Sequence, residues 1–317
     1  MDVVGIGETM VVFTPEINGP MRYARHYTSR IAGAETNTLI GLSKLGHPTG
    51  WISKVGNDEF GASILSFVRG EGVDVSRVKI EKQAPTGILF KEKVSQQRVN
   101  IYYYRKNSSA SLLAPADIDP DYIKQAKYLY ITGITPALSE SCKETIFTVI
   151  EIAKNHKIPV VFDPNLRKKL WEHDEAKRVL LMIAQKADII LPGVIEGEFL
   201  FATNNIQEIT ESFHQLGAKM VIVKLGEKGA YYSTNEEKGF VPAFKVEHMV
   251  DPVGAGDGFA AGFLSGLLDH LSIFEAVKRG CAIGALVTTV LGDVEGLPNR
   301  ETLQAFLSST SLEDVIR

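Results

Sequence analysis

The stretch Asp251-Pro-Val-Gly-Ala-Gly-Asp257-Gly-Phe-Ala-Ala-Gly262 places two carboxylates around a glycine-rich turn that runs into an apolar helical segment. Gly254 and Gly256 allow backbone torsions and a close approach that a side chain would prevent. The unpaired N–H groups of the first helical turn point into this turn, and the helix dipole favours an anion there. Asp257 stands at the same turn and can accept a proton beside that anion. This arrangement is suited to phosphoryl transfer to a hydroxyl group.

The sequence around this turn predicts an α/β fold. Short apolar strands alternate with amphipathic helices, which indicates a mostly parallel sheet covered on both faces. The predicted strands are 3–6, 50–55, 128–131, 159–162, 189–191 and 220–224. The predicted helices are 34–45, 59–71, about 142–156, 175–186 and 208–216. After Val253 the pattern is helical, with further helices expected at about 273–290 and 300–307.

Two segments interrupt this alternation and are predicted to form a small β lid. Residues 10–27 and 86–105 have the pattern of antiparallel strands, and the second segment folds back at the polar turn Ser95-Gln96-Gln97. Because no linker separates them from the rest, we expect one domain over residues 1–317 with lid segments at about 10–30 and 86–106. Alternation along Tyr102-Tyr-Tyr-Arg105 sends Tyr103 and Arg105 to one face. The alternative is that Arg105 is a solvated charge at the edge of the lid.

Composition argues against several classes of function. The chain has 317 residues, is 23% charged and carries a net charge of -4 without a cationic run, so neither nucleic acid nor a membrane surface is an expected partner. No stretch approaches the ~20 apolar residues of a membrane span, and the N-terminus lacks the basic flank of a signal peptide. Cys142 and Cys281 lie far apart in predicted helices, so we expect buried free thiols and a cytoplasmic location, with a disulfide between them as the alternative.

Four further motifs lie after predicted strands or at helix starts. Lys224-Leu-Gly-Glu-Lys-Gly229 and Asp163-Pro-Asn-Leu-Arg167 follow strands, at the sheet edge where open α/β folds bind ligands. A simple glycine-containing turn explains the first of these equally well. Gly33-Ala-Glu-Thr-Asn37 opens a helix and could contact a polar ligand, or it is only a helix start. Glu196 and Glu198 could hold Mg²⁺ through water, or they are solvated acidic residues at a helix N-terminus.

Other catalytic patterns are absent or incomplete. Gly5-Ile-Gly-Glu-Thr-Met10 has a methionine where a dinucleotide fingerprint has its third glycine, and a strand pattern follows it in place of a helix. A dinucleotide oxidoreductase is therefore the weakest of the candidate functions. The sequence has no Walker A loop and no Gly-x-Ser-x-Gly elbow, and its seven histidines show no zinc-ligand spacing.

Together these motifs resemble the signatures of the ribokinase-like carbohydrate kinases, the phosphofructokinase-B family. Residues 251–257 resemble the C-terminal signature, and residues 33–37, 45–46 and 55–61 resemble the N-terminal one. The resemblance spans the chain and implies a three-layer α/β sandwich with a mostly parallel central sheet and a small β-sheet lid. It also implies ATP as phosphoryl donor and Mg²⁺ as its counter-ion. Exposed lid strands commonly pair between subunits, so a homo-oligomer formed through the lid is expected.

Within this family, residues 103–110, 113–115, 133–138, 163–167 and 292–296 resemble those of the members that phosphorylate a sugar acid, 2-keto-3-deoxygluconate (2-dehydro-3-deoxy-D-gluconate), to its 6-phosphate. The chemistry agrees, because arginine binds carboxylates through paired, charge-assisted hydrogen bonds. Arg105 from the lid and Arg167 from the sheet edge could close on the acid from two sides. A fructokinase or another neutral-sugar kinase is the alternative, and a non-catalytic sugar or nucleotide sensor is a further one.

The resemblance implies a role for each motif residue. Asp257 is the implied general base, and the N–H groups of Gly254, Ala255 and Gly256 form the implied anion hole. The residues implied to bind the sugar acid are Gly33, Ala34, Asn37, Tyr103, Arg105, Arg167, Asp251 and Asp293. The residues implied to bind the nucleotide are Asn165, Lys224, Gly226, Lys228 and Gly229. Glu196 is the implied metal ligand, although Gly193 replaces the first residue of the family's Asn-x-x-Glu element.

Overall fold

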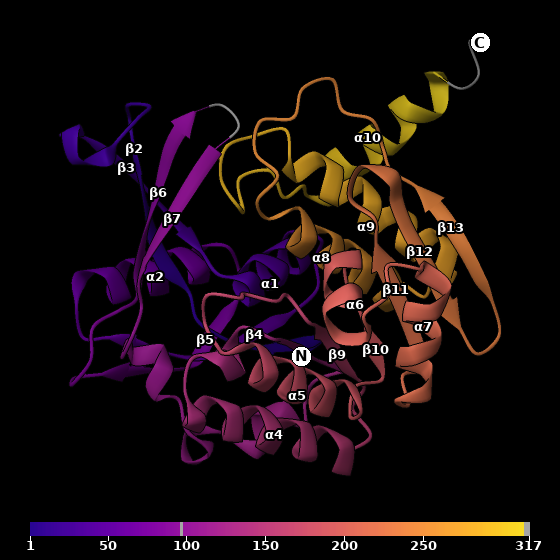
Figure 1. Cartoon of the computed structure of the whole chain (residues 1–317), viewed down its shortest axis with the longest axis horizontal. Helices are drawn as coiled ribbons and strands as arrows, with labels where there is room; N and C mark the ends of the chain where they lie inside the picture. Colours follow the sequence, from indigo (N-terminus) through magenta and orange to yellow (C-terminus); the bar gives the residue numbers. More distant parts are fainter. Residues whose placement is uncertain (96–97, 314–317) are drawn as a thin grey trace.

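The computed structural model describes residues 1–95 and 98–313, and the strands of this part of the chain form two sheets (Figure 1). The larger sheet has the strand order β13-β12-β11-β10-β9-β8-β1-β4-β5. These strands are β1 (Val3–Ile6), β4 (Thr49–Gly56), β5 (Asp74–Glu81), β8 (Tyr128–Thr132), β9 (Val160–Asp163), β10 (Ile189–Ile190), β11 (Met220–Lys224), β12 (Gly229–Thr234) and β13 (Lys238–Pro242). Neighbours from β5 to β11 pair in parallel, whereas β11, β12 and β13 pair antiparallel.

Helices cover both faces of the larger sheet, so the predicted three-layer α/β sandwich is confirmed. One face carries α1 (Ala34–Lys44), α2 (Glu59–Gly70), α8 (Ala255–Leu268), α9 (Ile273–Val287) and α10 (Arg300–Glu313). The other carries α3 (Pro120–Ile123), α4 (Glu140–Asn155), α5 (His173–Ala184), α6 (Val194–Phe201) and α7 (Ile206–Gln215). Short 3₁₀ turns lie at Met21–Tyr23, Ser109–Leu112, Pro115–Asp117, Thr135–Ala137 and Gly226–Lys228. Each face has its own apolar core, with Trp51 and Phe263 buried in the first and Phe162 and Phe213 in the second.

The smaller sheet is the predicted lid, and it stands away from the larger sheet at the upper left of Figure 1. Its order is β3 (Tyr27–Ala32), β2 (Met10–Pro15), β6 (Ile88–Ser95) and β7 (Arg98–Tyr104). The β2–β3 and β6–β7 pairs are antiparallel as predicted, but β2 and β6 pair in parallel, which makes the lid a mixed sheet. The predicted turn at Ser95-Gln96-Gln97 includes Gln96 and Gln97, which lie outside the described residues.

The periodicity of the sequence does not reveal every element. Strand β5 lies at the edge of the larger sheet, where most of its side chains face solvent and only Val75 is buried, so it lacks an apolar run. The hairpin of β12 and β13 extends the sheet beyond the turn that the sequence indicates after β11. Cys142 in α4 and Cys281 in α9 are buried and free, as expected. Among the described helices, none has the length and apolar character needed to cross a bilayer.

Candidate active site

A cavity of about 390 Å³ lies between the inner face of the lid and the carboxyl edge of the larger sheet. The lid contributes apolar side chains to it, among them Met10, Leu89 and Tyr103. Thirteen of the residues implied by the motifs line this cavity: Gly33, Ala34, Asn37, Tyr103, Arg105, Asn165, Arg167, Glu196, Lys224, Gly254, Gly256, Asp257 and Asp293. The parallel strands all end at this edge, and for that reason motifs far apart in the sequence meet there.

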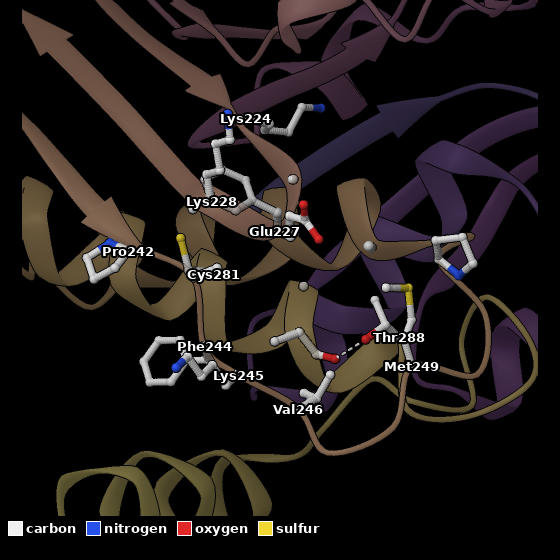
Figure 2. A pocket seen from close by; sticks show the side chains of 18 of the residues that line it. Lys224, Glu227, Lys228, Pro242, Phe244, Lys245, Val246, Met249, Cys281 and Thr288 are labelled. Atoms are coloured by element: carbon white, nitrogen blue, oxygen red, sulfur yellow. Dashed lines mark hydrogen bonds between the residues drawn. The ribbon is translucent and has the colours of Figure 1, made fainter. Parts of the chain in front are cut away.

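A second, larger cavity of about 900 Å³ lies on the other side of the α8 N-terminus. It contains the remaining implied nucleotide residues, Gly226, Lys228 and Gly229, and also Ala255. Figure 2 shows Lys224 at one end of this cavity and Phe244, Lys245 and Val246 at the opposite end. Lys224 and Gly256 line both cavities. The first turn of α8 therefore lies at the junction of the two spaces.

The backbone at this junction requires glycine. Gly254 caps α8 with φ 82°, a left-handed conformation that other residues rarely adopt. A Cβ atom at Gly254 would lie 2.9 Å from the carbonyl oxygen of Asp293, so the two loops approach closely. The N–H groups of residues 254–256 belong to the helix start, where the helix dipole favours negative charge, and that of Ala255 makes a long hydrogen bond of 3.4 Å to the carbonyl of Pro252. The turn therefore offers an anion site between the two cavities.

Asp257 lies in the first turn of α8 and is almost completely buried. Its Oδ2 accepts a hydrogen bond of 2.8 Å from the side-chain amide of Asn37 in α1. The same amide nitrogen lies 3.5 Å from Oδ2 of Asp293. Asn37 therefore links the two carboxylates, and this link fixes the orientation of Asp257 toward the cavity beneath the lid.

The surroundings of Asp257 favour a base that works near neutral pH. Burial raises the pKa of Asp257 to about 8, against the hydrogen bond from Asn37 that lowers it, and the charges of Asp163 and Asp293 raise it further. Burial also raises the pKa of Asp293 to about 6, partly offset by the ammonium group of Lys91. A carboxylate with such a pKa in a cleft is typical of an acid–base residue in catalysis.

Arg105 is not the solvated edge charge of the alternative interpretation. Its side chain is 7% exposed, pairs with Glu8 and lies over the ring of Tyr103, with 5.4 Å from Cζ to the ring centroid. Tyr102 and Tyr104 are 41% and 60% exposed on the opposite face, so the predicted alternation of β7 is confirmed. The buried Nε of Arg105 finds no hydrogen-bond acceptor among the described residues. Its guanidinium group therefore carries one buried donor that the described residues leave unsatisfied.

Sequence reasoning missed Glu8 and Lys91. Glu8 follows β1 at the same sheet edge as the other motifs, and that position could have identified it. Lys91 lies on the same inner face of β6 as Leu89 and pairs with Asp251. Asp251 consequently lines a separate crevice of about 40 Å³ beside Asp293 and does not line the cavity beneath the lid. Of the implied substrate residues, Asp251 is the one that does not line the cavity beneath the lid.

Glu196 lines the cavity from the start of α6, where its Oε2 accepts a hydrogen bond of 2.8 Å from the N–H of Gly193. Within residues 1–95 and 98–313, no group of three or more His, Cys, Asp and Glu side chains could hold a metal ion. A single carboxylate beside the anion site nevertheless fits Mg²⁺, which keeps several waters and binds phosphate oxygens. The chain therefore offers one direct or water-mediated ligand, and phosphate groups would have to supply others.

Comparisons with known proteins extend over nearly the whole chain. The profile of the pfkB family carbohydrate kinase matches residues 1–300. The chain is 44% identical over 312 residues to 2-dehydro-3-deoxygluconokinase of Bacillus subtilis (strain 168), covering 98% of this chain and 96% of that protein. It is 32% identical over 306 residues to Fructokinase-2 of Solanum lycopersicum, covering 93% of each. A solved structure of Ribokinase II from E. coli, in complex with ATP and Mg²⁺, superposes with a TM-score of 0.91 at 26% identity, covering 97% of this chain and 99% of that one.

Proposed function

Because this chain belongs to the pfkB family of carbohydrate kinases, we propose that it transfers the γ-phosphoryl group of ATP to the 6-hydroxyl of 2-dehydro-3-deoxy-D-gluconate. The observation that carries this proposal is the location of the α8 N-terminus. The carboxylate of Asp257 lines the cavity beneath the lid, and Gly256 of the same helical turn lines both cavities, which supports a base and an anion site at their junction. The sugar acid occupies the first cavity and ATP the second.

In the proposed reaction Asp257 accepts the proton of the 6-hydroxyl as its oxygen bonds to the γ-phosphorus. The bond from that phosphorus to the oxygen it shares with the β-phosphate breaks, and ADP leaves with the bridging oxygen. The N–H groups of Gly254, Ala255 and Gly256 donate to the transferring phosphoryl oxygens. Glu196 would hold Mg²⁺ directly or through water, and the ion would supply positive charge to the phosphates.

The carboxylate of the substrate is assigned to Arg167 and Arg105. Arg167 lies at the cavity mouth, is exposed, and forms no ion pair with any residue in the described part of the chain. The free Nε of Arg105 adds a second donor from the lid side. A sugar acid matches these donors, and the named activity of the 44% identical Bacillus relative supports the same substrate.

A neutral-sugar kinase is the second candidate function, and the ion pair between Arg105 and Glu8 favours it. Glu8 already balances the charge of Arg105, so that arginine attracts a carboxylate less strongly than a free guanidinium group would. The fructokinase relative, 32% identical, agrees with this alternative. A direct comparison of acidic and neutral sugars decides between the two.

We also propose that two copies of the chain associate through the outer face of the lid in the cytoplasm. That face carries Phe13, Phe90 and Tyr104 in ring contact, at centroid distances of 5.3 and 5.7 Å. Tyr104 is exposed, Phe13 and Phe90 are half-buried, and an aromatic cluster that is partly open to solvent is typical of an interface. Light scattering should give twice the mass of the chain for the wild type and the mass of one chain for Tyr104→Glu. A wild-type monomer would contradict the association.

The buried free thiols support the proposed cytoplasmic location.

The variant Asp257→Asn tests the catalytic proposal. We expect kcat to fall by roughly 10²–10⁴-fold, the usual contribution of a general base, with the KM values for sugar and ATP nearly unchanged. Asn37 can still donate to the side-chain oxygen of the new amide, so the local geometry is kept. Turnover near that of the wild type would remove Asp257 from this role.

A further inference from the structure

We propose that Lys224 is a catalytic residue whose ammonium group binds the transferring phosphoryl group, and that Asp163 is the residue that positions it. This inference rests on the proposed function and adds a role that goes beyond lining the nucleotide cavity. It depends on where Nζ of Lys224 lies relative to the two cavities and to the first turn of α8.

The side chain of Lys224 reaches its position over the chain that continues from β10, where the carbonyl of Pro192 accepts a hydrogen bond from the N–H of Lys224. Lys224 is the last residue of β11, and its Nζ lies 2.6 Å from Oδ2 of Asp163, the last residue of β9. Strand β10 lies between them and spans only Ile189–Ile190, so it ends before its neighbours. Asp163 is 1% exposed, and its Oδ1 accepts a hydrogen bond of 3.2 Å from the N–H of Asn165. The carboxylate is thus oriented on both oxygens and holds the ammonium group in one place.

The ammonium group lies where the two cavities meet. Lys224 lines both of them, whereas Lys228, in the turn that follows, lines only the nucleotide cavity (Figure 2). A Cβ atom at Gly256 would lie 3.7 Å from Nζ of Lys224, which places the ammonium group beside the first turn of α8. A phosphoryl group that passes from one cavity to the other at this turn comes within reach of both the backbone N–H groups and Lys224.

The chemistry of the step calls for a fixed cation at this point. The charge of the transferring group is spread over its three equatorial oxygens, and preorganised donors stabilise it most when they need not move. Burial alone would lower the pKa of Lys224, but the carboxylates of Asp163 and Glu196 raise it above its usual value, so the side chain stays protonated. Asp163 also compensates the charge of Lys224 when no phosphate is present.

The alternative is that this ion pair only ties β9 to β11. A purely structural pair affects stability when it is broken, and it does not reduce kcat selectively at an unchanged KM. The steady-state constants of Lys224→Met, with Lys228→Met as the matched control, therefore separate the two roles. They are measured with whichever sugar the wild-type protein phosphorylates.

We expect Lys224→Met to lower kcat by roughly 10²–10³-fold, as for the loss of one oxyanion donor, with both KM values within about threefold of wild type. Lys224→Arg should recover a large part of this loss, because it restores the charge. Lys228→Met should raise the KM for ATP and leave kcat within about threefold. A kcat of Lys224→Met within about threefold of wild type, or a defect confined to the KM for ATP, would overturn the catalytic role of Lys224. Melting temperatures identify a folding defect, and Lys224→Gln then serves as the second uncharged variant.

The positioning role of Asp163 is tested by a double-mutant cycle. At a pH above the pKa of Asp257, where the charge of Asp163 no longer changes the ionisation of that base, Asp163→Asn should lower kcat in the wild-type background and have little further effect in Lys224→Met, because its contribution acts through the ammonium group. Additive losses in kcat would contradict that role. If the wild-type protein phosphorylates no sugar, the proposed function fails and this inference with it. If the wild type is active and Lys224→Met is equally active, only this inference fails.

Discussion

Asp257 is a carboxylate whose surroundings oppose its ionisation, and its activity should therefore depend on pH. Burial, with the charges of Asp163 and Asp293, raises the pKa of Asp257 to about 8. Only the ionised form accepts a proton, so kcat/KM for the sugar should fall about tenfold per pH unit below that pH. Asp293→Asn should move this limb to lower pH, because it removes one of the negative charges. A limb that stays in place in Asp293→Asn would contradict the electrostatic account.

The same shift in pKa has a consequence for stability. The folded protein holds a proton on Asp257 up to about pH 8, whereas the unfolded chain releases it near the ordinary pKa of an aspartate, 3.8. Unfolding therefore releases this proton between those two pH values, and the free energy of unfolding falls as pH rises through that window. Asp257→Asn lacks this loss. The melting temperature of this variant, measured relative to that of the wild type, should therefore increase from pH 5 to about pH 9. A difference in melting temperature that stays constant over this range would contradict the raised pKa of Asp257.

The proposed binding of the substrate carboxylate depends on two side chains, Arg167 and Arg105. Arg167→Ala should raise the KM for the sugar acid by roughly 10-fold or more, the worth of one charge-assisted hydrogen bond, and leave the KM for ATP nearly unchanged. Arg105→Ala should raise the same KM but also lower the melting temperature, because it leaves Glu8 buried without its partner. Arg167→Ala is thus the cleaner variant. An equal rise of KM for fructose and for the acid would argue against carboxylate binding.

At the scale of elements, the start of α8 is the feature on which both cavities depend. Gly254→Ala should lower the free energy of unfolding by about 1–2 kcal/mol, since alanine pays the cost of a left-handed backbone. It would also press against the backbone of Asp293, and kcat should fall with it. The denaturant midpoint and the steady-state rate measure the two effects.

Gly256→Ala is the matched control for that substitution. A Cβ atom there meets only Nζ of Lys224, at 3.7 Å, which is an ordinary contact. Stability should therefore be unchanged or slightly higher, because alanine is favoured over glycine inside a helix by about 0.5–1 kcal/mol. The added methyl group faces the junction, so kcat should fall without a loss of stability. Equal destabilisation by both variants would contradict the special conformation of Gly254.

The positions of strands and helices could be predicted where the spacing of apolar residues follows the burial of their side chains. The strands β1, β8 and β11 are apolar because both of their faces are covered, and β7 alternates because one face of the lid is exposed. Strand β5 escapes prediction because it is an edge strand with few buried side chains. The sequence does not reveal the shortness of β10 either, nor the contact that Lys224 makes with Asp163 across it.

At the scale of the whole molecule, the sequence predicts which motifs line the cavities, but it does not predict the ion-pair partners of their residues. The residues that line the two cavities could be named because each follows a strand or opens a helix. The ion pairs of Arg105 with Glu8 and of Lys91 with Asp251 join lid and body across long sequence separations. Such pairs depend on how the lid lies over the sheet, which local patterns do not encode. Among the described residues that line the cavity beneath the lid, Arg167 is the cation without an ion pair.

The most direct test of the whole account is a coupled ADP-release assay with the purified protein, ATP and Mg²⁺. It compares kcat/KM for 2-dehydro-3-deoxy-D-gluconate with the values for fructose and ribose. Because a carboxylate held by arginine contributes about 1.5–3 kcal/mol, the acid should exceed both neutral sugars by roughly 10-fold to 100-fold. A fructose or ribose value equal to or above that of the acid would contradict the proposed substrate, and no ADP release with any sugar would contradict the proposed kinase activity.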